Sequence, residues 1–346
     1  MNVTVVDPVT NPSWRQLVAT RPTTLFHSPE WLSVLADTYE FTVEARVVED
    51  EQGRPVAGMP YVTVHDFMDP RTGLPFSDFC DPLADTPHQW RALIDDLLAV
   101  RQRIDLRCLH NDIPLRDDRF TVVDRALWHA IDVRRDEDMV WTELPGSARR
   151  ALRRARSSGV EISAARDESD LRAFWELHVR VRKYKYGLLA QPFAFMRHIW
   201  DTFVAKDGGT LLLATIDGNV VAGVMFLEWQ GVLYYKFNAS DAAHLKARPN
   251  DLLLWEGMEF ARKRGLEAVD LGLTDGDQDG LIRYKRKYAS QEKLITLLRH
   301  QPADMPSAQD RMARGVLRDV TRLLTDHSVP DELSGRAGDV LYRYFS

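Results

Sequence analysis

The second half of this chain alternates short apolar runs with tight turns, and this pattern restricts the folds open to it. Three runs read as strands, at 210–216, 220–229 and 232–238. Asp217-Gly218-Asn219 and Gln230-Gly231 lie between them as hairpin turns. A helix at 251–264, ended by Gly265, and a strand at 268–273 follow. Antiparallel strands combined with helices and one further strand predict an α+β domain.

A strand, an acidic turn and a cationic cluster follow one another between Val269 and Ser290. Asp270 lies within the strand, and residues 275–280 are rich in Asp and Gly. Six basic or aromatic residues then stand in a row: Arg283, Tyr284, Lys285, Arg286, Lys287 and Tyr288. Like charges this close repel, so they are either solvated or facing an anion. Two interpretations stay open: a solvated helix start, or a site where a cation meets negative charge developing on a reacting carbonyl.

Length and composition favour two domains of a soluble globular protein. The 346 residues are 45% hydrophobic and 28% charged, and the formal net charge of −6 gives no global basic field for nucleic acid. Any RNA contact therefore needs a local patch. The two cysteines, Cys80 and Cys108, form neither a disulfide framework nor a zinc motif, so no metal site is expected. Without a signal peptide or a membrane-spanning run, the sequence predicts a cytoplasmic protein.

A charged segment at 134–138 marks the expected domain boundary. Residues 1–135 are predicted to form a first domain, with a helix capped by Ser28 before Pro29. Residues 136–300 are predicted to form a second domain, and 301–346 a C-terminal helical tail. Other expected elements are helices at 90–100, 193–204 and 308–324, and strands at 41–48, 56–64, 104–109, 120–131 and 160–164.

Two helices carry unusual concentrations of positive charge. The first, at 144–157, presents Arg149, Arg150, Arg153 and Arg154 around an alanine-rich face, with no acids to offset them. Its i,i+4 like-charge pairs are each destabilising by a few tenths of a kcal/mol. It is either a solvated helix near a domain junction or an anion-binding face for phosphate or RNA. The second ends in residues 180–187. The helix dipole favours cations at a C-terminus, but it does not explain the tyrosines between them, which would fit a ligand pocket.

The loop at 74–83 places Asp78 and Cys80 among prolines and aromatic residues. Prolines near both ends forbid a regular strand ladder, so a well-packed surface loop is the simplest interpretation. Cys80 has no His or Lys near it in sequence, so a reactive thiolate has little support.

Several ordered blocks together resemble the FemAB-like branch of the GNAT acyltransferase superfamily. They span roughly residues 20 to 300 and are the segments 74–83, 149–160, 180–187, 234–240, 249–256, 269–272 and 280–288. The resemblance implies two tandem GNAT-like domains, each a mostly antiparallel mixed sheet flanked by helices. It also implies an activity that joins an acyl or aminoacyl group to an amine, forming an amide. Peptidoglycan-bridge members take the aminoacyl group from charged tRNA, and other members use acyl thioesters.

The resemblance also assigns roles to individual residues. A Phe-Lys pair of the family falls on Tyr284-Lys285, so Lys285 is expected to stabilise the oxyanion while Tyr284 shapes the pocket. From the residues themselves, Asp270 is a further catalytic candidate, and Asp270, Asp78 and His178 are the candidate bases. The remaining candidates for substrate binding are Asp78, Arg182, Lys185, Tyr186, Tyr235, Asn238, Ser240 and Arg286.

The sequence departs from the family at three points, one of which is that the long inserted helical hairpin of some relatives is not seen. No lysine follows Trp31, where bridge-forming enzymes use one to hold substrate phosphates, although Arg182 or Lys185 can stand for their second-domain arginine. The usual GNAT pyrophosphate loop is also missing, and residues 239–250 lie in its place. This departure argues against acetyl-CoA in its standard pose.

The predicted function is transfer of an aminoacyl group from aminoacyl-tRNA, without a cofactor, to an amine of a small molecule or a peptidoglycan (muropeptide) precursor. The arginines 149, 150, 153 and 154 are the expected RNA contacts. One alternative is an N-acyltransferase that uses acyl-CoA or another thioester, and the other is a non-catalytic module that binds RNA or an anion. A binding module should lose affinity steadily as cations are removed, whereas an enzyme should lose turnover at Lys285.

Overall fold

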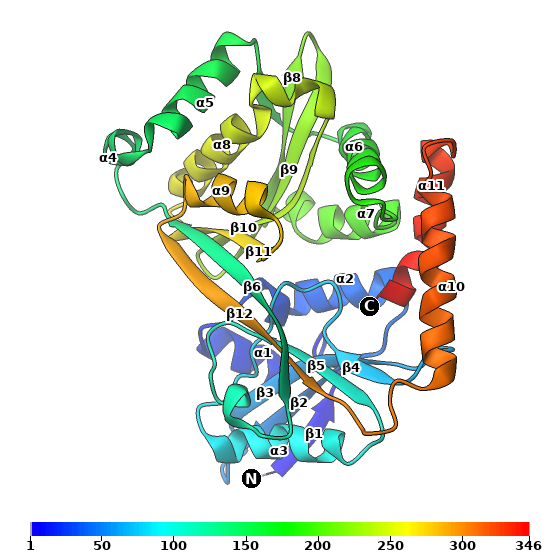
Figure 1. Cartoon of the computed structure of the whole chain (residues 1–346). Helices are drawn as coiled ribbons and strands as arrows, with labels where there is room; N and C mark the ends of the chain where they lie inside the picture. Colours follow the sequence, from blue (N-terminus) through cyan, green and yellow to red (C-terminus); the bar gives the residue numbers. More distant parts are fainter. Residues whose placement is uncertain (1, 346) are drawn as a thin grey trace. The chain divides into compact units, whose positions relative to one another are not determined.

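The computed structural model describes residues 2–345, which divide into two compact units (Figure 1). Unit 1 comprises residues 2–127 and 293–318 of the described chain, and unit 2 comprises 128–292 and 319–345. The chain enters unit 2 within strand β6 (Thr121–Asp132) and returns within β12 (Gln291–His300). Helix α10 (Ala308–Leu324) then carries it into unit 2 again.

Unit 1 contains the first part of β6 and most of β12 together with the N-terminal elements. These are β1 (Asn2–Val6), α1 (Pro12–Thr20), η1 (Leu25–His27), α2 (Pro29–Tyr39), β2 (Val43–Glu49), β3 (Pro55–Val64), β4 (Arg71–Gly73), α3 (Pro87–Leu98), β5 (Arg103–Cys108) and η2 (Pro114–Arg116). Its strands lie in the order β1-β2-β3-β4-β5-β12-β6. The pairs β1–β2, β2–β3, β3–β4 and β5–β12 are antiparallel, and β4–β5 is parallel.

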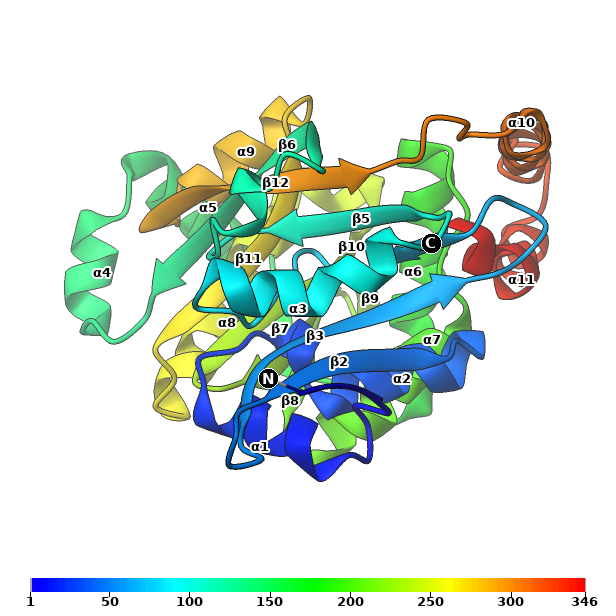
Figure 2. The same ribbon diagram turned by 90° about the horizontal axis from the view of Figure 1, so that it is seen from below.

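Local sequence signals explain several elements of unit 1. Ser28 caps α2 as predicted, because its side chain accepts a hydrogen bond from the Trp31 backbone N–H at 3.0 Å. Pro29 is the first helical residue. Helix α3 covers β2 and β3 (Figure 2), and its apolar face, which includes Trp90 and Leu93, forms a core with Ile104 of β5.

Unit 2 contains most of the remaining elements. They are α4 (Glu137–Glu143), α5 (Gly146–Ser157), β7 (Glu161–Ala164), α6 (Glu168–Tyr186), α7 (Phe193–Thr202), η3 (Val204–Lys206), β8 (Gly209–Ile216), β9 (Asn219–Trp229), β10 (Val232–Ser240), η4 (Ala242–Ala247), α8 (Pro249–Lys263), β11 (Ala268–Asp275), α9 (Asp279–Arg286), α11 (Asp331–Leu341) and η5 (Tyr342–Phe345).

The sheet of unit 2 runs β11-β10-β9-β8-β7. The pairs from β7 to β10 are antiparallel, and β10 and β11 are parallel. In Figure 1, α5 and α8 lie on one side of β8 and β9, and α6 and α7 lie on the other. The core between α8 and the sheet holds Phe226, Trp255 and Met258, all at most 2% exposed. Both units are thus mixed, mostly antiparallel sheets flanked by helices, which confirms the predicted α+β class.

Some elements were not predicted. Helices α1 and α4 and strands β4 and β12 have no counterpart among the expected elements, and α11 lies in the segment 301–346, which was expected only as a helical tail. The observed passage into unit 2, between Leu127 and Trp128, lies inside a strand rather than in the charged segment 134–138. Residues 319–345 group with unit 2 because α11 packs on α6, where a Cβ on Gly335 would lie 2.8 Å from the Trp175 ring.

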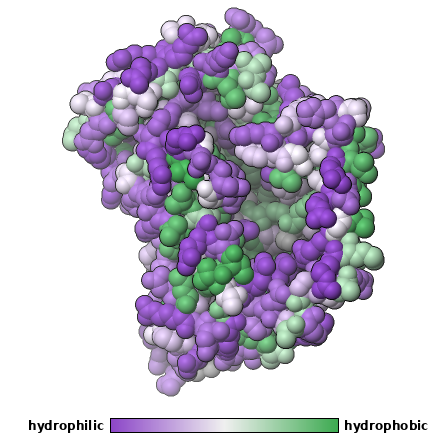
Figure 3. All heavy atoms as spheres, in the orientation of Figure 1, coloured by the Kyte–Doolittle hydropathy of each residue, from purple (hydrophilic) through white to green (hydrophobic). Residues whose placement is uncertain are grey.

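Helix α10 is amphipathic as predicted, but part of its apolar face lies on the surface. Met312, Val316 and Leu323 are 69%, 58% and 70% exposed, and their spacing places them along one stripe. Figure 3 shows apolar surface along the outer side of α10 on a face that is otherwise largely hydrophilic. Among residues 2–345, no helix combines the length and the apolar character needed to cross a bilayer.

Candidate functional site

The parallel strands β10 and β11 of unit 2 pair over only part of their length. β10 and β11 pair only over Val232–Tyr234 and Ala268–Asp270. Immediately after this pairing, a register irregularity between Tyr235 and Phe237 bends β10 against β9. No further pair joins β10 to β11 among the described residues, although both strands continue. A bulge that ends strand pairing leaves backbone groups available to a ligand.

Helix α8 begins close to the end of β10. Arg248 precedes it in a left-handed conformation, with φ of 64°, and Pro249 is its first residue. The Asn250 side chain donates to Ser240 Oγ at 3.1 Å and accepts from Asn238 Nδ2 at 3.1 Å. Two of the predicted substrate-binding residues, Asn238 and Ser240, therefore lie together at this helix start. The N-terminus of a 15-residue helix favours negative charge beside it.

Two tyrosines, Tyr284 of α9 and Tyr235 of β10, complete this side of the site. Tyr284 donates its hydroxyl proton to the Asn250 carbonyl at 2.9 Å. Burial, together with its neighbour Tyr235 and the Asp251 carboxylate, raises the pKa of Tyr284 well above its usual value. Burial likewise raises the pKa of Tyr235. Both predicted residues are therefore neutral phenols at physiological pH, suited to shaping a pocket and donating hydrogen bonds.

Asp251 is an ionisable residue that the sequence analysis did not select. It is 3% exposed and accepts from Lys287 Nζ and from the Tyr288 hydroxyl, both at 2.6 Å. These contacts connect the first turn of α8 to the end of α9. Their function is to fix the two elements that carry Asn250 and Tyr284.

Lys285 of α9 is buried against β11, with 4% of its surface exposed. Its Nζ donates to the carbonyls of Gly272 and Leu273, both at 3.0 Å. Gly272 has a φ of 68°, a left-handed conformation that favours glycine. The ammonium group is therefore held by backbone oxygens just beyond the last residue at which β10 and β11 pair.

Asp270 stabilises the same turn. One of its oxygens accepts from Trp128 Nε1 at 2.9 Å, and the other accepts from the Gly272 backbone N–H at 2.6 Å. Because Gly272 in turn accepts from Lys285, Asp270 fixes the backbone that holds the lysine. Two of the three predicted catalytic residues are thus joined through one glycine.

A buried histidine that feels the charge of Lys285 was missed by the sequence analysis. His129 is fully buried, and its Nε2 lies 2.8 Å from Glu292 Oε2. Burial lowers the pKa of His129, outweighing the contact with Glu292, and the nearby charges of Lys285 and Arg286 lower it further. The neutral ring donates from Nε2, and Nδ1 has no hydrogen-bond partner within residues 2–345. Since 163 residues separate His129 from Glu292, no spacing in the sequence could have indicated the pair.

Glu292 also holds Arg286, which the sequence analysis assigned to substrate binding. Arg286 donates to both Glu292 oxygens, at 2.6 and 2.9 Å. The arginine is more than half exposed. Its hydrogen bonds, helped by that from His129, lower the pKa of Glu292 to about 2.

The stability supplied by Glu292 should depend on pH. Because its pKa in the folded protein lies below the ordinary value of 4.5, its contribution is present above pH 4.5 and is lost as the pH falls toward 2. We therefore expect the difference in unfolding free energy between wild type and Glu292→Gln to shrink over that range. Urea titrations at a series of pH values measure it. A difference that stays constant down to pH 2 would contradict the expectation.

The other candidates lie away from these contacts. On α6, Arg182 donates from Nε to the Leu189 carbonyl at 3.1 Å, and Lys185 lies 4.8 Å from the centre of the Tyr186 ring. His178 is buried and contacts Gln191 at 2.7 Å, and burial lowers its pKa to about 4.

On α5, Arg149 donates to the Thr142 carbonyl at 2.6 Å, whereas Arg150, Arg153 and Arg154 are exposed. The predicted basic face therefore exists, although one of its four arginines is engaged within the protein.

Asp78 lies in unit 1, in the loop at 74–83, where it is half-buried. Its neighbour Ser77 accepts from Trp31 Nε1 at 2.9 Å, and Asp81 accepts from three consecutive backbone N–H groups, at residues 109–111. Burial raises the pKa of the Cys80 thiol, so it is not a thiolate at neutral pH. The loop is packed as predicted.

Part of unit 2 matches a known protein family. Residues 146–286, from α5 to the end of α9, match the family model described as acetyltransferase (GNAT) domain. That range contains Asp270, Tyr284 and Lys285. No curated protein matches the sequence.

Solved structures match nearly the whole chain. FemX superimposes with a TM-score of 0.65 at 13% identity, covering 92% of this chain and 100% of FemX. The C-terminal domain of a putative lysylphosphatidylglycerol synthetase from Agrobacterium fabrum gives 0.57 at 12% identity, covering 88% and 96%. A tandem GNAT protein from the clavulanic acid biosynthesis pathway also gives 0.57 at 12% identity, covering 88% and 100%.

At these identities the likeness to solved structures concerns the fold. It agrees with the two mixed sheets, with the family match over α5 to α9, and with the blocks that pointed to this family in the sequence. The chain is a GNAT-fold protein with the architecture of FemX, and the predicted resemblance to the FemAB-like branch is confirmed.

Proposed function

We propose that this protein is an N-acyltransferase that transfers an aminoacyl group from aminoacyl-tRNA to an amine. The acceptor is a small molecule or a peptidoglycan precursor. The observation that supports this most strongly is the buried Lys285 ammonium, held by two carbonyls where β10 and β11 separate. A fixed positive charge in a site shielded from water is suited to stabilise the oxyanion of acyl transfer.

The proposed reaction is balanced without a cofactor. The acceptor nitrogen attacks the carbonyl carbon of the aminoacyl ester, and a C–N bond forms while the carbonyl oxygen gains negative charge. Lys285 stabilises this oxyanion, and Tyr284 and Tyr235 shape the surrounding pocket. When the intermediate collapses, the C–O bond to the tRNA ribose breaks, and the proton lost by nitrogen ends on the released hydroxyl. Most of the acceleration then comes from positioning and electrostatics.

Asp270 acts as a positioning residue in this proposal. Both of its oxygens already accept hydrogen bonds, and one of these holds Gly272, whose carbonyl accepts from Lys285. Its contribution is therefore to keep the lysine in place rather than to move a proton. His129 is neutral, and the charge of Lys285 reaches it and lowers its pKa, so it is better suited to accept a proton from the attacking amine.

The choice of donor rests on two further observations. Residues 239–250 form the end of β10, the short helix η4 and the start of α8, with no glycine-rich turn to cradle a pyrophosphate. Helix α5 presents the exposed Arg150, Arg153 and Arg154, which suit an RNA backbone. Against this, the start of α8 is itself a favourable anion site, so a thioester donor such as an acyl-CoA is the second candidate.

A transfer assay distinguishes the two donors. Purified protein is incubated with charged tRNA carrying labelled amino acids, with or without RNase, and in parallel with an acyl-CoA panel and a pool of amines that includes muropeptide precursors. We expect labelled amide only when tRNA is intact. Transfer from CoA thioesters would overturn the donor assignment but keep the acyltransferase. Binding of tRNA without transfer from either donor would favour a non-catalytic module.

The arginines of α5 should affect only the tRNA-dependent reaction. Replacing Arg150, Arg153 and Arg154 together with glutamine should raise KM for aminoacyl-tRNA about tenfold and flatten its salt dependence, because about three phosphate contacts are lost. Turnover at saturating tRNA should change little. Arg166→Gln, also in unit 2 and with a side chain 85% exposed, is the matched control. An unchanged KM and salt slope in the triple variant would remove α5 from the RNA interface.

A further inference from the structure

Unit 1 contains a cavity of about 430 Å³ that the proposed acyl transfer does not use. It lies where the start of α10 meets β5 and β12. Its charged lining includes Asp69, Arg103, Arg299, Asp310 and Arg314, and Met305 contributes an apolar wall. Cavities of this size accept small organic molecules.

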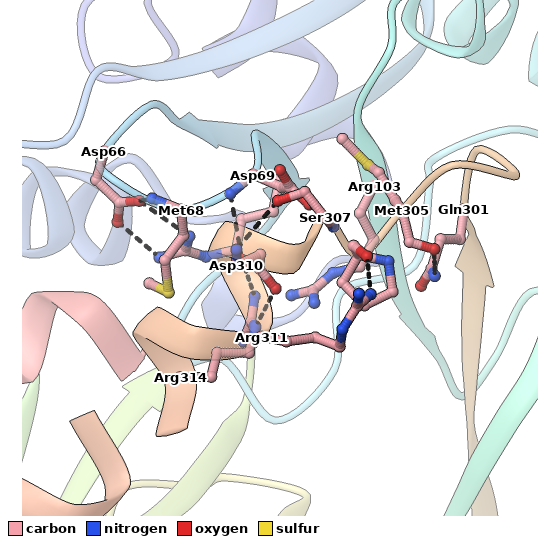
Figure 4. Close-up of polar contacts among 12 residues, drawn as sticks. Asp66, Met68, Asp69, Arg103, Gln301, Met305, Ser307, Asp310, Arg311 and Arg314 are labelled. Carbon is pink, nitrogen blue, oxygen red and sulfur yellow. Dashed lines mark hydrogen bonds and ion pairs between the residues drawn. The ribbon is translucent and has the colours of Figure 1, made fainter. Parts of the chain in front are cut away.

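The carboxylates of the cavity are occupied by contacts that hold α10 in place. Asp69 accepts from the Ser307 backbone N–H at 2.6 Å, and its own N–H donates to Asp310 at 3.2 Å. Asp310 also accepts from Arg314 Nε at 2.6 Å. Figure 4 shows these hydrogen bonds linking Ser307, Asp69, Asp310 and Arg314. Burial alone would raise the pKa of Asp310, but these donors hold it below its usual value, so it remains charged.

Two arginines are oriented by one carboxylate. Arg299 of β12 and Asp105 of β5 are register partners, and their Nε and Oδ1 atoms lie 2.6 Å apart. The other oxygen of Asp105 lies 2.7 Å from Arg103 Nε, an ion pair that is not aligned as a hydrogen bond. Each guanidinium is thus fixed through its Nε edge. Within residues 2–345, the terminal nitrogens of Arg103 and Arg299 have no hydrogen-bond partner.

The surroundings of Arg103 are cationic. Its side chain is 19% exposed, and burial lowers its pKa. Asp105 opposes this effect, while Arg314, Arg299 and Arg71 add to it. Guanidinium groups whose Nη edges lack partners in a partly dry cavity are favourable places for an anion, because charge-assisted pairing to an oxyanion is strong and can be bidentate.

We propose that this cavity binds a small organic oxyanion, a carboxylate or a phosphate monoester. Arg103 and Arg299 contact its oxygens, Arg314 lies at the rim, and Met305 contacts its apolar part. Because every group involved belongs to unit 1, the proposal does not depend on the acyl transfer assigned to unit 2.

Three probes with the same ring test the chemistry in wild-type protein. Benzoate and phenyl phosphate carry the two kinds of oxyanion, and benzyl alcohol carries none. Calorimetry should show that at least one anion binds about 100-fold more tightly than the alcohol, since about two charge-assisted contacts distinguish them. The tighter anion identifies the chemical class. An alcohol that binds as well as both anions, or no binding of any probe, overturns the proposal.

The binding must also be located in the cavity. Arg299→Lys keeps a cation beside Asp105 but loses the planar guanidinium group, which can donate two parallel hydrogen bonds to an oxyanion. It should weaken anion binding about tenfold. Arg101→Gln is the matched control, because Arg101 is 56% exposed and pairs with Asp304 outside the lining. In wild type, the carbon-13 resonance of the Met305 methyl group should shift on titration, which keeps the test valid if the variant fails to fold. Equal losses in both variants, or binding without a shift of that methyl, contradict the assignment.

Discussion

Replacing Lys285 with methionine should slow amide formation by about two to three orders of magnitude, the usual effect of removing one oxyanion-stabilising donor. The effect should appear in kcat, because the charge is needed only when the carbonyl oxygen becomes negative. Methionine is similar in length and apolar, so the main loss is the ammonium group itself. Single-turnover transfer from labelled donor to amine measures the chemical step directly.

Stability has to be controlled in this experiment. Lys285 donates to the carbonyls of Gly272 and Leu273, and losing these bonds in a buried site should lower the unfolding free energy by about 1–3 kcal/mol. The assay is therefore run well below the Tm of the variant. Arg283→Met supplies the matched control, since Arg283 lies on the same helix and is exposed.

The comparison between these variants separates the possible roles of Lys285. A large loss of kcat in Lys285→Met, with Arg283→Met unaffected and donor KM unchanged, supports the oxyanion role. If Lys285→Met keeps its rate and loses only stability, the lysine has a structural role in holding the turn at Gly272. The central step of the proposed mechanism is then wrong.

The strands of unit 2 could be predicted because their turns have local causes. Asp217 and Gly218, and then Gln230 and Gly231, adopt positive φ values between 42° and 78°, as two-residue hairpin turns require. Residues of this type between apolar runs are visible in any single sequence. Gly265, which ends α8 with a φ of 69°, was recognisable for the same reason.

β12 could not be recognised in the same way. Its residues pair with β5, almost two hundred positions earlier in the chain, and its first four residues are exposed. Neither a tight turn nor a clean alternation marks it. The existence of this strand depends on a distant partner, so single-sequence propensity could not have selected it.

The residues of the candidate site likewise fall into those with local sequence signals and those without. Lys285 and Tyr284 were selected through an unusual local cluster and a family resemblance, and Asp270 lay in the adjoining strand. His129, Glu292 and Asp251 were not selected, because each has a partner more than 30 residues away in the chain. A lone histidine in a strand, or an acid at a helix start, has an ordinary structural explanation until the fold shows what it contacts.

Asp251 should be among the most costly residues of unit 2 to remove. Asp251→Ala leaves the Lys287 ammonium and the Tyr288 hydroxyl without their shared acceptor, and breaking such a buried pair costs about 3–5 kcal/mol. It also removes an acid from the first turn of α8, where the helix dipole favours one. Urea unfolding of the purified variant measures the loss. Asp279→Ala, which removes an exposed first-turn acid from α9, should cost less than about 1 kcal/mol.

A double-mutant cycle tests whether the loss comes from these contacts. Tyr288→Phe alone should cost about 1.5–3 kcal/mol, as expected for a hydrogen bond to a charged group. In the Asp251→Ala background the same substitution should cost almost nothing, because the acceptor is already gone. If the two losses simply add, Asp251 stabilises α8 through the helix dipole alone. The contact between the first turn of α8 and the end of α9 would then not be what fixes Asn250 and Tyr284.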